Sequence, residues 1–421
     1  MTAPSTPAGG AAEPGAALPF PNPFLSPELL ENPYAFYARL RAASPVLRLP
    51  LPIPGPGVFA LTRYADVEEV LRDGERFSVD RLQADIVQRF RDRLPAQFLG
   101  GPQGIRTMLL LDPPEHTRLR GLVNKAFTPR RVAALAPRIE ALVEELLAPA
   151  RRERRMDVME DLAAPLPAIV IAELLGVPVE DHRRFKHWAS ELVNALGAGG
   201  PIDSGPRVEK AMAPLLDYLR GVIEARRAEP RDDLISALIE AQEERDALTD
   251  QELLSNSFLL LLAGHETTTN LIGNGLLALL RSPEQWQRLR AEPGRLEHAI
   301  EELLRFDSPV QATVRVAKQD LELAGAAIPA RAMVVVGLGA ANHDPAAFPD
   351  PDRLDVCRAN VRHLSFGFGG HFCLGAGLAR LEARCAFRAL LEQAPDVRLA
   401  GPVTRRPNFL LRGLASLPVA F

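Results

Sequence analysis

Residues Phe366–Gly377 read FGFGGHFCLGAG, and this stretch decides how the rest of the chain is interpreted. It places five glycines, one histidine and Cys373 within twelve residues. A cysteine that only fills a core has no need of so much glycine, which loses more backbone entropy on folding than any other residue. We therefore expect the main chain at Cys373 to approach another group very closely.

The residues after Cys373 predict a helix that begins at or just past the cysteine. Leu374, Leu378, Leu381 and Cys385 recur at helical spacing. The positive end of a helix dipole lowers the pKa of a thiol and favours thiolate. A buried free cysteine is the simpler alternative, and it suits Cys385 within the apolar stripe better than Cys373. Thiolate and bare backbone together are what iron in a flat macrocycle requires.

Composition limits the possible functions. The chain has 421 residues, of which 47% are hydrophobic and 24% charged, with a net charge of −4. Because the chain has no excess of positive charge, we do not expect nucleic-acid binding to be its main function. Three cysteines, Cys357, Cys373 and Cys385, favour a reduced, cytoplasmic protein. No basic residue precedes Arg39, so no signal peptide is expected. The longest apolar run, residues 258–264, is too short for a membrane anchor.

Helical patterns dominate the chain, and short strand-like pieces lie near both ends. We expect a disordered lead over residues 1–20, rich in Ala, Pro and Gly, followed by a single domain over 21–421. Residues 77–108 are predicted to form a long loop, and residues 196–206 a flexible connection. The predicted fold class is mainly α, one large helical domain with a minor β-sheet region.

Two other motifs point elsewhere but are incomplete. The stretch beginning at His265 resembles a zinc-protease helix, but Thr269 stands where the second histidine belongs. Residues 334–342 resemble a strand and dinucleotide loop, but Asn342 replaces the third glycine and no helix pattern follows. Neither motif predicts a site.

The pattern Phe366-Gly367-x-Gly369-x-His371-x-Cys373-x-Gly375 resembles the haem-ligand signature of the cytochrome P450 superfamily. Further resemblances follow in the family's order: HTRLR at residues 116–120, AGHETT at 263–268 and EELLR at 301–305. They cover essentially all of the chain from about residue 33 onward. The resemblance implies the cytochrome P450 fold with haem b as cofactor.

The resemblance also implies roles for residues around the haem. Cys373 would be the thiolate ligand of the iron, the metal ligand whose electron donation favours O–O cleavage. Propionates need cationic partners, and their partners would be His116, Arg120, Arg315 and His371. The remaining cofactor-binding residues would be Ala263, Gly264, Phe366 and Gly375. Ala263 and Gly264 would leave space for oxygen, aided by a local disturbance of helix hydrogen bonds.

Oxygen activation and folding would fall to two further groups. Thr267 would hydrogen-bond the activated oxygen, and Glu266 would relay protons to it. Glu302, Arg305 and Arg353 would form a buried structural triad that holds the segment leading to the cysteine loop.

The implied substrate is a hydrophobic small molecule held mainly by shape. Its pocket would include Leu259, Leu262, Val310, Ala312, Thr313, Leu410 and Leu411. The implied activity is a monooxygenase that hydroxylates or epoxidises the substrate with O2. Electrons would come from a ferredoxin and an NAD(P)H-dependent ferredoxin reductase docking near Arg362 and Arg380, and the protein would act as a cytoplasmic monomer. A peroxygenase driven by H2O2 and a haem-thiolate sensor without turnover are the alternatives.

Overall fold

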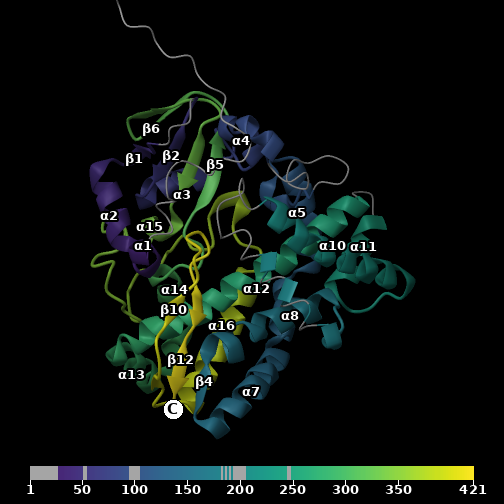
Figure 1. Ribbon diagram of the computed structural model, residues 1–421, viewed down its shortest axis with the longest axis vertical. Coiled ribbons are helices and arrows are strands. Elements are labelled where there is room, and N and C mark those ends of the chain that lie inside the picture. The colour runs from purple at the N-terminus through teal and green to yellow at the C-terminus, as the bar shows by residue number, and fades with distance from the viewer. Residues whose placement is uncertain are drawn as a thin grey trace, which may run out of the picture.

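The computed structural model describes residues 27–50, 55–93, 105–181, 184, 187–188, 191–192, 205–243 and 248–421 (Figure 1). The predicted lead over residues 1–20 lies outside the described residues. So does most of the predicted connection over 196–206, although its last two residues begin helix α10.

Helices make up most of the fold, which confirms the predicted class. The longest is α12, Asp250–Leu280. The others are α1 (Pro27–Glu31), α2 (Tyr34–Ala43), α3 (Tyr64–Arg72), α4 (Asp85–Arg89), α5 (Glu115–Ala126), α6 (Pro129–Ala134), α7 (Ala136–Glu153), α8 (Pro165–Leu175), α10 (Gly205–Ala228), α11 (Leu234–Glu243), α13 (Pro283–Ala291), α14 (Leu296–Phe306), α15 (Leu338–Ala341) and α16 (Ala376–Gln393).

Helix α12 lies at the centre of the helical part, and its sequence explains why it forms there and is buried. Thr249 and Glu252 form a reciprocal capping box that satisfies two free amides at its start. Apolar residues then occur all around the helix, so it is buried between α8, α10, α14 and α16. No helix in the described ranges is both long and apolar enough to cross a membrane.

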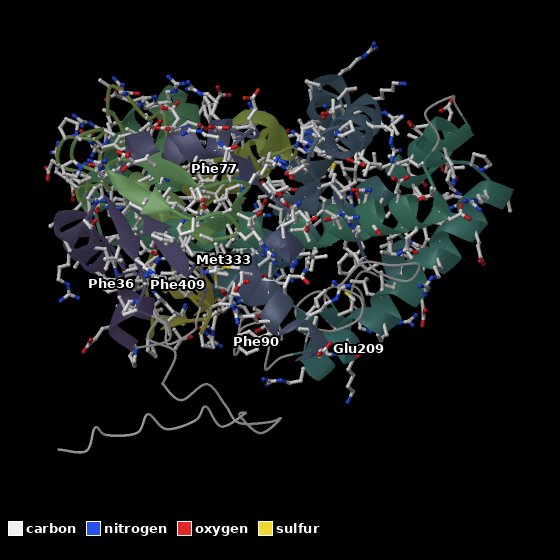
Figure 2. All side chains as sticks on the ribbon, turned by 90° about the horizontal axis from the view of Figure 1, so that it is seen from above. Phe36, Phe77, Phe90, Glu209, Met333 and Phe409 are labelled. Carbon is white, nitrogen blue, oxygen red and sulfur yellow. The ribbon has the colours of Figure 1, made fainter. Side chains whose placement is uncertain are left out.

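The main sheet has five strands in the order β1-β2-β8-β5-β3. They are β1 (Val46–Arg48), β2 (Val58–Leu61), β8 (Met333–Val336), β5 (Thr313–Ala317) and β3 (Phe77–Ser78). Strand β2 runs parallel to β8, while the other pairs are antiparallel. The sheet lies beside α2, α3 and α15, at one end of the molecule (Figure 1). From above, Phe77 and Met333 mark the sheet and Glu209 marks the helical side (Figure 2).

Three small sheets complete the fold. They are β4 (Arg155–Asp157) with β12 (Pro418–Ala420) and β9 (Arg398–Leu399), β10 (Thr404–Arg405) with β11 (Leu414–Ser416), and β6 (Leu321–Leu323) with β7 (Ala326–Ile328). The strand pattern over residues 414–421 thus divides between two sheets. The chain passes from one sheet to the other at Leu417, whose amide donates to Asp157 of β4 at 3.1 Å.

The predicted loop over residues 77–108 contains more local structure than its weak periodicity suggested. It begins with β3 and continues through two short 3₁₀ helices and α4 to Arg93. Asp80 caps the first of these turns by accepting from the amide of Leu82. Residues 94–104 lie outside the described ranges.

Candidate active site

Cys373 lies between a 3₁₀ turn, Gly369–His371, and the first residue of α16. Its amide donates to the carbonyl of Phe366 at 2.8 Å, which closes the loop. The amides of Gly375 and Ala376 donate to its sulfur. The predicted helix start directly after the cysteine is therefore correct, and the first amides of α16 point at the sulfur.

The pKa of the Cys373 thiol is raised, and here the prediction from the helix terminus is wrong. Burial raises the pKa more than the amides of Gly375 and Ala376 and the charges of Arg120 and Arg380 together lower it. The dipole argument considers only the local chain, whereas burial depends on the packing of the whole loop. Without a bound metal the thiol form is favoured, and binding to a metal ion deprotonates a thiol outright.

Glycine is required at particular positions of the loop by backbone conformation and by close contacts, which is more specific than predicted. Gly367 and Gly369 both have φ of 71°, a conformation that other residues rarely adopt. A Cβ on Gly369 would lie 2.9 Å from the carbonyl oxygen of Leu71 at the end of α3. Gly375, by contrast, would meet no protein atom within 4 Å. Only Gly375 therefore keeps the open space that the approach of a flat ligand requires.

Four predicted cofactor residues, His116, Arg120, Arg315 and His371, form one group, in which the two arginines carry the positive charge. The rings of His116 and His371 stack with their centroids 3.9 Å apart. Arg120 donates to the carbonyl of Phe372 at 2.7 Å, beside Cys373. Within the described ranges none of the four forms an ion pair with a carboxylate, and the charge of Asp112 acts only weakly on Arg315 and the two histidines.

The pKa values of this group show the effect of burial first and of mutual repulsion second. Burial, and then the charge of Arg81, lower the pKa of Arg315 to about 10. Burial, His116 and Arg315 lower the pKa of His371 to about 3. A dianionic ligand would relieve both effects, so the residues present fit the two propionates of haem. Arg81 was missed from the sequence because nothing in its pattern shows that it lies near β5.

Phe366 lies against the same loop. Its ring meets Phe372 edge to face at 6.2 Å, and the guanidinium of Arg380 lies 4.6 Å from its centre. Arg380 also pairs with Glu301 at 2.7 Å. Burial favours a higher pKa for Glu301, but Arg380 and His363 lower it to about 2. The charge of Arg380 is therefore largely compensated, which weakens its predicted role in docking a partner.

One stripe of α12 remains accessible while most of the helix is buried. It contains Leu259, Leu262, Ala263 and Thr267, all predicted to face the oxygen or the substrate. The hydroxyl of Thr267 donates to the carbonyl of Ala263 at 3.0 Å. The helix nevertheless runs unbroken through this region, so the predicted disturbance consists only of hydroxyls competing for carbonyl oxygens.

Gly264 has a different role from the one predicted. A Cβ at this position would lie 3.1 Å from Cγ1 of Ile171 on α8. The glycine therefore lets α12 and α8 approach closely, and the space it provides is already filled by protein.

Glu266 follows Leu262 and Ala263 by one helical turn but, unlike the accessible stripe, is only 1% exposed. Its Oε1 accepts from Nη1 of Arg406 at 2.5 Å, while the described residues offer its Oε2 no hydrogen bond of ordinary geometry, although Asn270 lies close enough to lower the pKa. Burial raises the pKa of Glu266, and Arg406 opposes this. Sequence reasoning missed Arg406, because it lies 140 residues away in a segment without periodicity.

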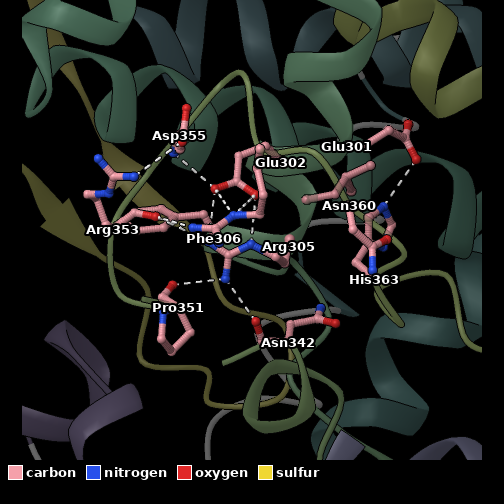
Figure 3. Close-up of polar contacts among 12 residues, drawn as sticks. Glu301, Glu302, Arg305, Phe306, Asn342, Pro351, Arg353, Asp355, Asn360 and His363 are labelled. Atoms are coloured by element: carbon pink, nitrogen blue, oxygen red, sulfur yellow. Dashed lines mark hydrogen bonds and ion pairs between the residues drawn. The ribbon is translucent and has the colours of Figure 1, made fainter. Parts of the chain in front are cut away.

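Glu302 and Arg305 are fully buried and form a bidentate pair at 2.7 and 2.9 Å (Figure 3). Arg305 also donates to the carbonyls of Asn342 and Pro351. The predicted pair is thus present, and Arg305 contacts the backbone of the segment that leads to the cysteine loop.

Arg353, however, is not the third member of the triad. Its side chain is 64% exposed and pairs with Asp350 and Asp355. Arg358 takes that position instead, 9% exposed and 3.1 Å from both oxygens of Glu302. Arg353 contributes only its backbone carbonyl, which accepts from Arg305 and Arg358. Two arginines in an irregular segment cannot be distinguished by spacing, so the sequence pointed to the wrong one.

The two predicted pocket segments meet. Val310 and Leu411 form an isolated antiparallel bridge, and the amide of Gln311 donates to the carbonyl of Leu410 at 2.9 Å. Ala312 and Thr313 are partly buried where β5 begins, and Leu410 is 49% exposed. The segment around Val310 and the turn around Leu410 therefore lie side by side.

The structure also shows a buried acid that the sequence did not reveal. Glu382 on α16 is 1% exposed, and burial raises its pKa to about 8. Thr268 on α12 faces it and lowers the pKa slightly, but neither carboxylate oxygen has a hydrogen-bond partner of ordinary geometry within the described residues. Glu382 is therefore a protonated carboxyl in the interface between α12 and α16.

Comparison with known proteins agrees with this geometry. The profile of the family named Cytochrome P450 matches residues 53–393. A vitamin D(3) 25-hydroxylase of Pseudonocardia autotrophica is 44% identical over 398 residues, covering 92% of this chain and 94% of the relative. The cytochrome P450 monooxygenase PikC of Streptomyces venezuelae is 42% identical over 402 residues, covering 94% and 92%. The solved structure of myxobacterial CYP267B1 in complex with myristic acid matches with a TM-score of 0.84 and 42% identity, covering 94% of this chain and 98% of that one.

Proposed function

This chain belongs to the cytochrome P450 family, and from that premise we propose that it hydroxylates or epoxidises a hydrophobic small molecule with electrons from a ferredoxin and its NAD(P)H-dependent reductase. As a P450 monooxygenase it uses haem b and O2. The overall reaction takes one substrate molecule, O2, two electrons and two protons to the oxygenated product and water.

One observation carries the proposal of the site. Cys373 lies in a turn whose amides point at its sulfur, beside Arg120, which forms no ion pair with a carboxylate among the described residues. We propose that Cys373 binds the iron and that His116, Arg120, Arg315 and His371 hold the propionates. Haem, when bound, supplies the iron at which O2 is activated. Arg120 belongs to both parts, since its guanidinium lowers the pKa of Cys373.

Thr267 and Glu266 on α12 would transfer protons to the site. The Thr267 hydroxyl, which donates to Ala263, can turn to donate to oxygen beside the accessible stripe. Glu266 would hold the proton that is delivered there, because burial and Arg406 act on its pKa in opposite directions. A group poised in this way can both take up and release a proton.

The substrate would be bound by the apolar lining. Leucine and valine side chains from α12, from the segment before β5 and from the turn before β11 contribute no charge. Such a lining favours an extended or fused-ring apolar molecule recognised by shape. Two of the similar proteins support this class, since one is named for vitamin D(3) and another holds myristic acid.

The electron donor would dock near Cys373. Arg362 is 67% exposed and close to the loop, although Glu68 pairs with it at 3.3 Å. An acidic ferredoxin can compete for an exposed pair of this kind because such pairs are weak in water. All three cysteines are free, which supports a protein that acts in the reducing cytoplasm, and we propose that it acts as a monomer.

The test is product formation from a panel of sterols, fatty acids and macrolactones under three conditions. We expect product with ferredoxin, reductase and NADPH together, and little with H2O2 alone. Product with H2O2 alone at an equal rate would replace the monooxygenase by a peroxygenase. Haem spin-state shifts without product under any condition would indicate a binding protein.

A further inference from the structure

The turn that carries two predicted substrate contacts is tied to the predicted proton donor. Strands β10 and β11 form a hairpin, and its turn runs from Arg406 to Gly413. At the base of the turn, the amide of Arg406 donates to the carbonyl of Gly413 at 3.2 Å. The Arg406 side chain reaches Glu266 on α12 at 2.5 Å. We call residues 404–416 the C-terminal hairpin.

The C-terminal hairpin is fixed to one face of α12. Glu266, Asn270 and Asn274 are spaced four apart and so lie on one side of the helix. Asn274 donates to the carbonyl of Arg412 at 2.9 Å. Gly413 packs so closely that a Cβ there would lie 1.9 Å from Oδ1 of Asn270. Contact along this face is therefore continuous, and the ion pair is its end nearest to Thr267.

The other side of the same turn meets the substrate lining. The amides of Gln311 and Arg412 donate to the carbonyls of Leu410 and Pro309 at 2.9 and 2.8 Å. Leu410 and Leu411 lie at the tip of the turn. A molecule that displaces the tip therefore acts on a short segment whose base holds the carboxylate of Glu266.

We propose that Arg406 is a positioning residue that couples the seating of substrate against the hairpin tip to the freedom of Glu266 to move a proton. This inference rests on the proposed function of Glu266. In the observed state the ion pair holds Oε1 of Glu266 against Arg406 at 2.5 Å. Displacement of the tip by an apolar molecule lengthens the pair and frees the side chain. Proton delivery then follows substrate binding.

The charges around Glu266 make this coupling effective. Among the described residues, burial acts most strongly on its pKa, then Arg406, then Asn270. Its helix neighbour His265 is buried as well, and Glu382 on the adjacent α16 faces Thr268 instead. Arg406 is thus the charged side chain that acts most strongly on the pKa of Glu266 among the described residues.

The test compares Arg406→Gln, Arg406→Lys and Glu266→Gln with the wild type, as purified holoproteins. Arg151→Gln is the matched control, because Arg151 forms an exposed pair with Glu144 at 3.1 Å on α7. Infrared difference titration follows the carboxyl band that is missing in Glu266→Gln. Hydrogen exchange follows residues 404–416, with and without myristic acid as the probe.

We expect Arg406→Gln to raise the pKa of Glu266 by about one unit or more, as the loss of a neighbouring opposite charge does. Exchange of the hairpin should quicken in both Arg406→Gln and Glu266→Gln, and stay normal in Arg151→Gln. Arg406→Lys should lie between, because it keeps the charge. Myristic acid should change hairpin exchange in the wild type and raise the pKa of Glu266.

The coupling would be overturned if the titration of Glu266 were unchanged in Arg406→Gln. It would also be overturned if myristic acid shifted the haem spin state but left hydrogen exchange of the hairpin unchanged. These measurements need no turnover. A failure of the proposed function itself would appear separately, as a wild type that forms no product with ferredoxin, reductase and NADPH.

Discussion

Glu302 and Glu266 are both buried glutamates paired with arginine, but their surroundings differ. Glu302 accepts from Arg305, from Arg358 and from the amide of Asp355, so both of its oxygens are satisfied (Figure 3). Glu266 pairs with Arg406 and is influenced more weakly by the side chain of Asn270, and its Oε2 has no hydrogen bond of ordinary geometry within the described residues. A fully satisfied ion pair is rigid, whereas a half-satisfied one can be exchanged at low cost. The first suits a structural support and the second suits a group that must move.

The largest effect should come from breaking the Glu302 network. Arg305→Ala and Arg358→Ala each remove one of the two arginines that pair with the buried Glu302 and leave hydrogen bonds of the network unmade, so each should cost about 3–5 kcal/mol of unfolding free energy. Urea denaturation and haem content measure this. Arg353→Ala is the matched control and should stay within about 0.5 kcal/mol, because its side chain is exposed. Normal haem content in Arg305→Ala would contradict the structural role.

Glu266→Gln should leave the fold intact and lower product formation. Loss of a proton-transfer group typically costs about a hundredfold or more. The rate of product formation should therefore fall by at least that factor, while urea denaturation shows a much smaller change than in Arg305→Ala. A Glu266→Gln protein with wild-type turnover would remove Glu266 from the reaction and leave the two buried glutamates with the same structural role.

Thr267→Ala should redirect electrons and leave haem binding unchanged. Without the hydroxyl, NADPH oxidation should continue while H2O2 accumulates at the expense of product. Thr267→Ser keeps the hydroxyl and is expected to restore most of the yield of product per NADPH. Equal yields in Thr267→Ala and the wild type would be incompatible with the role.

A third buried glutamate extends the comparison to one with no arginine at all. The pKa of Glu382 is raised to about 8 by burial, so the folded state holds a proton that the unfolded state has lost above its ordinary pKa. Stability from this group is therefore complete at low pH and falls as pH rises toward 8. Glu382→Gln removes that fall and should be more stable than the wild type by about 4 kcal/mol at pH 8.

Unfolding of the wild type and Glu382→Gln in urea at pH 5, 6, 7 and 8 measures the effect. The two curves should converge at pH 5. A difference that is constant with pH would show that Glu382 does not titrate in this range.

Much of the site could be predicted from the sequence because its motifs are local. The helix after Cys373, the helix containing Thr267 and the Glu302–Arg305 pair follow from spacings of three and four residues. What could not be predicted depends on distant segments. Arg406 meets Glu266 only because the C-terminal hairpin packs on α12, and Arg358 replaces Arg353 through the path of an irregular loop. The pKa of Cys373 differed in sign because burial is a property of the whole fold.

The most direct test of the account is the spectrum of the reduced holoprotein with carbon monoxide. The wild type and Cys385→Ala, which changes the buried cysteine of α16, should both show the strongly red-shifted Soret band of thiolate-bound haem. Cys373→Ser should lose the shift while it retains the fold by circular dichroism. A red-shifted band that persists in Cys373→Ser, or its absence from the wild type, would contradict the assignment of Cys373 as the iron ligand.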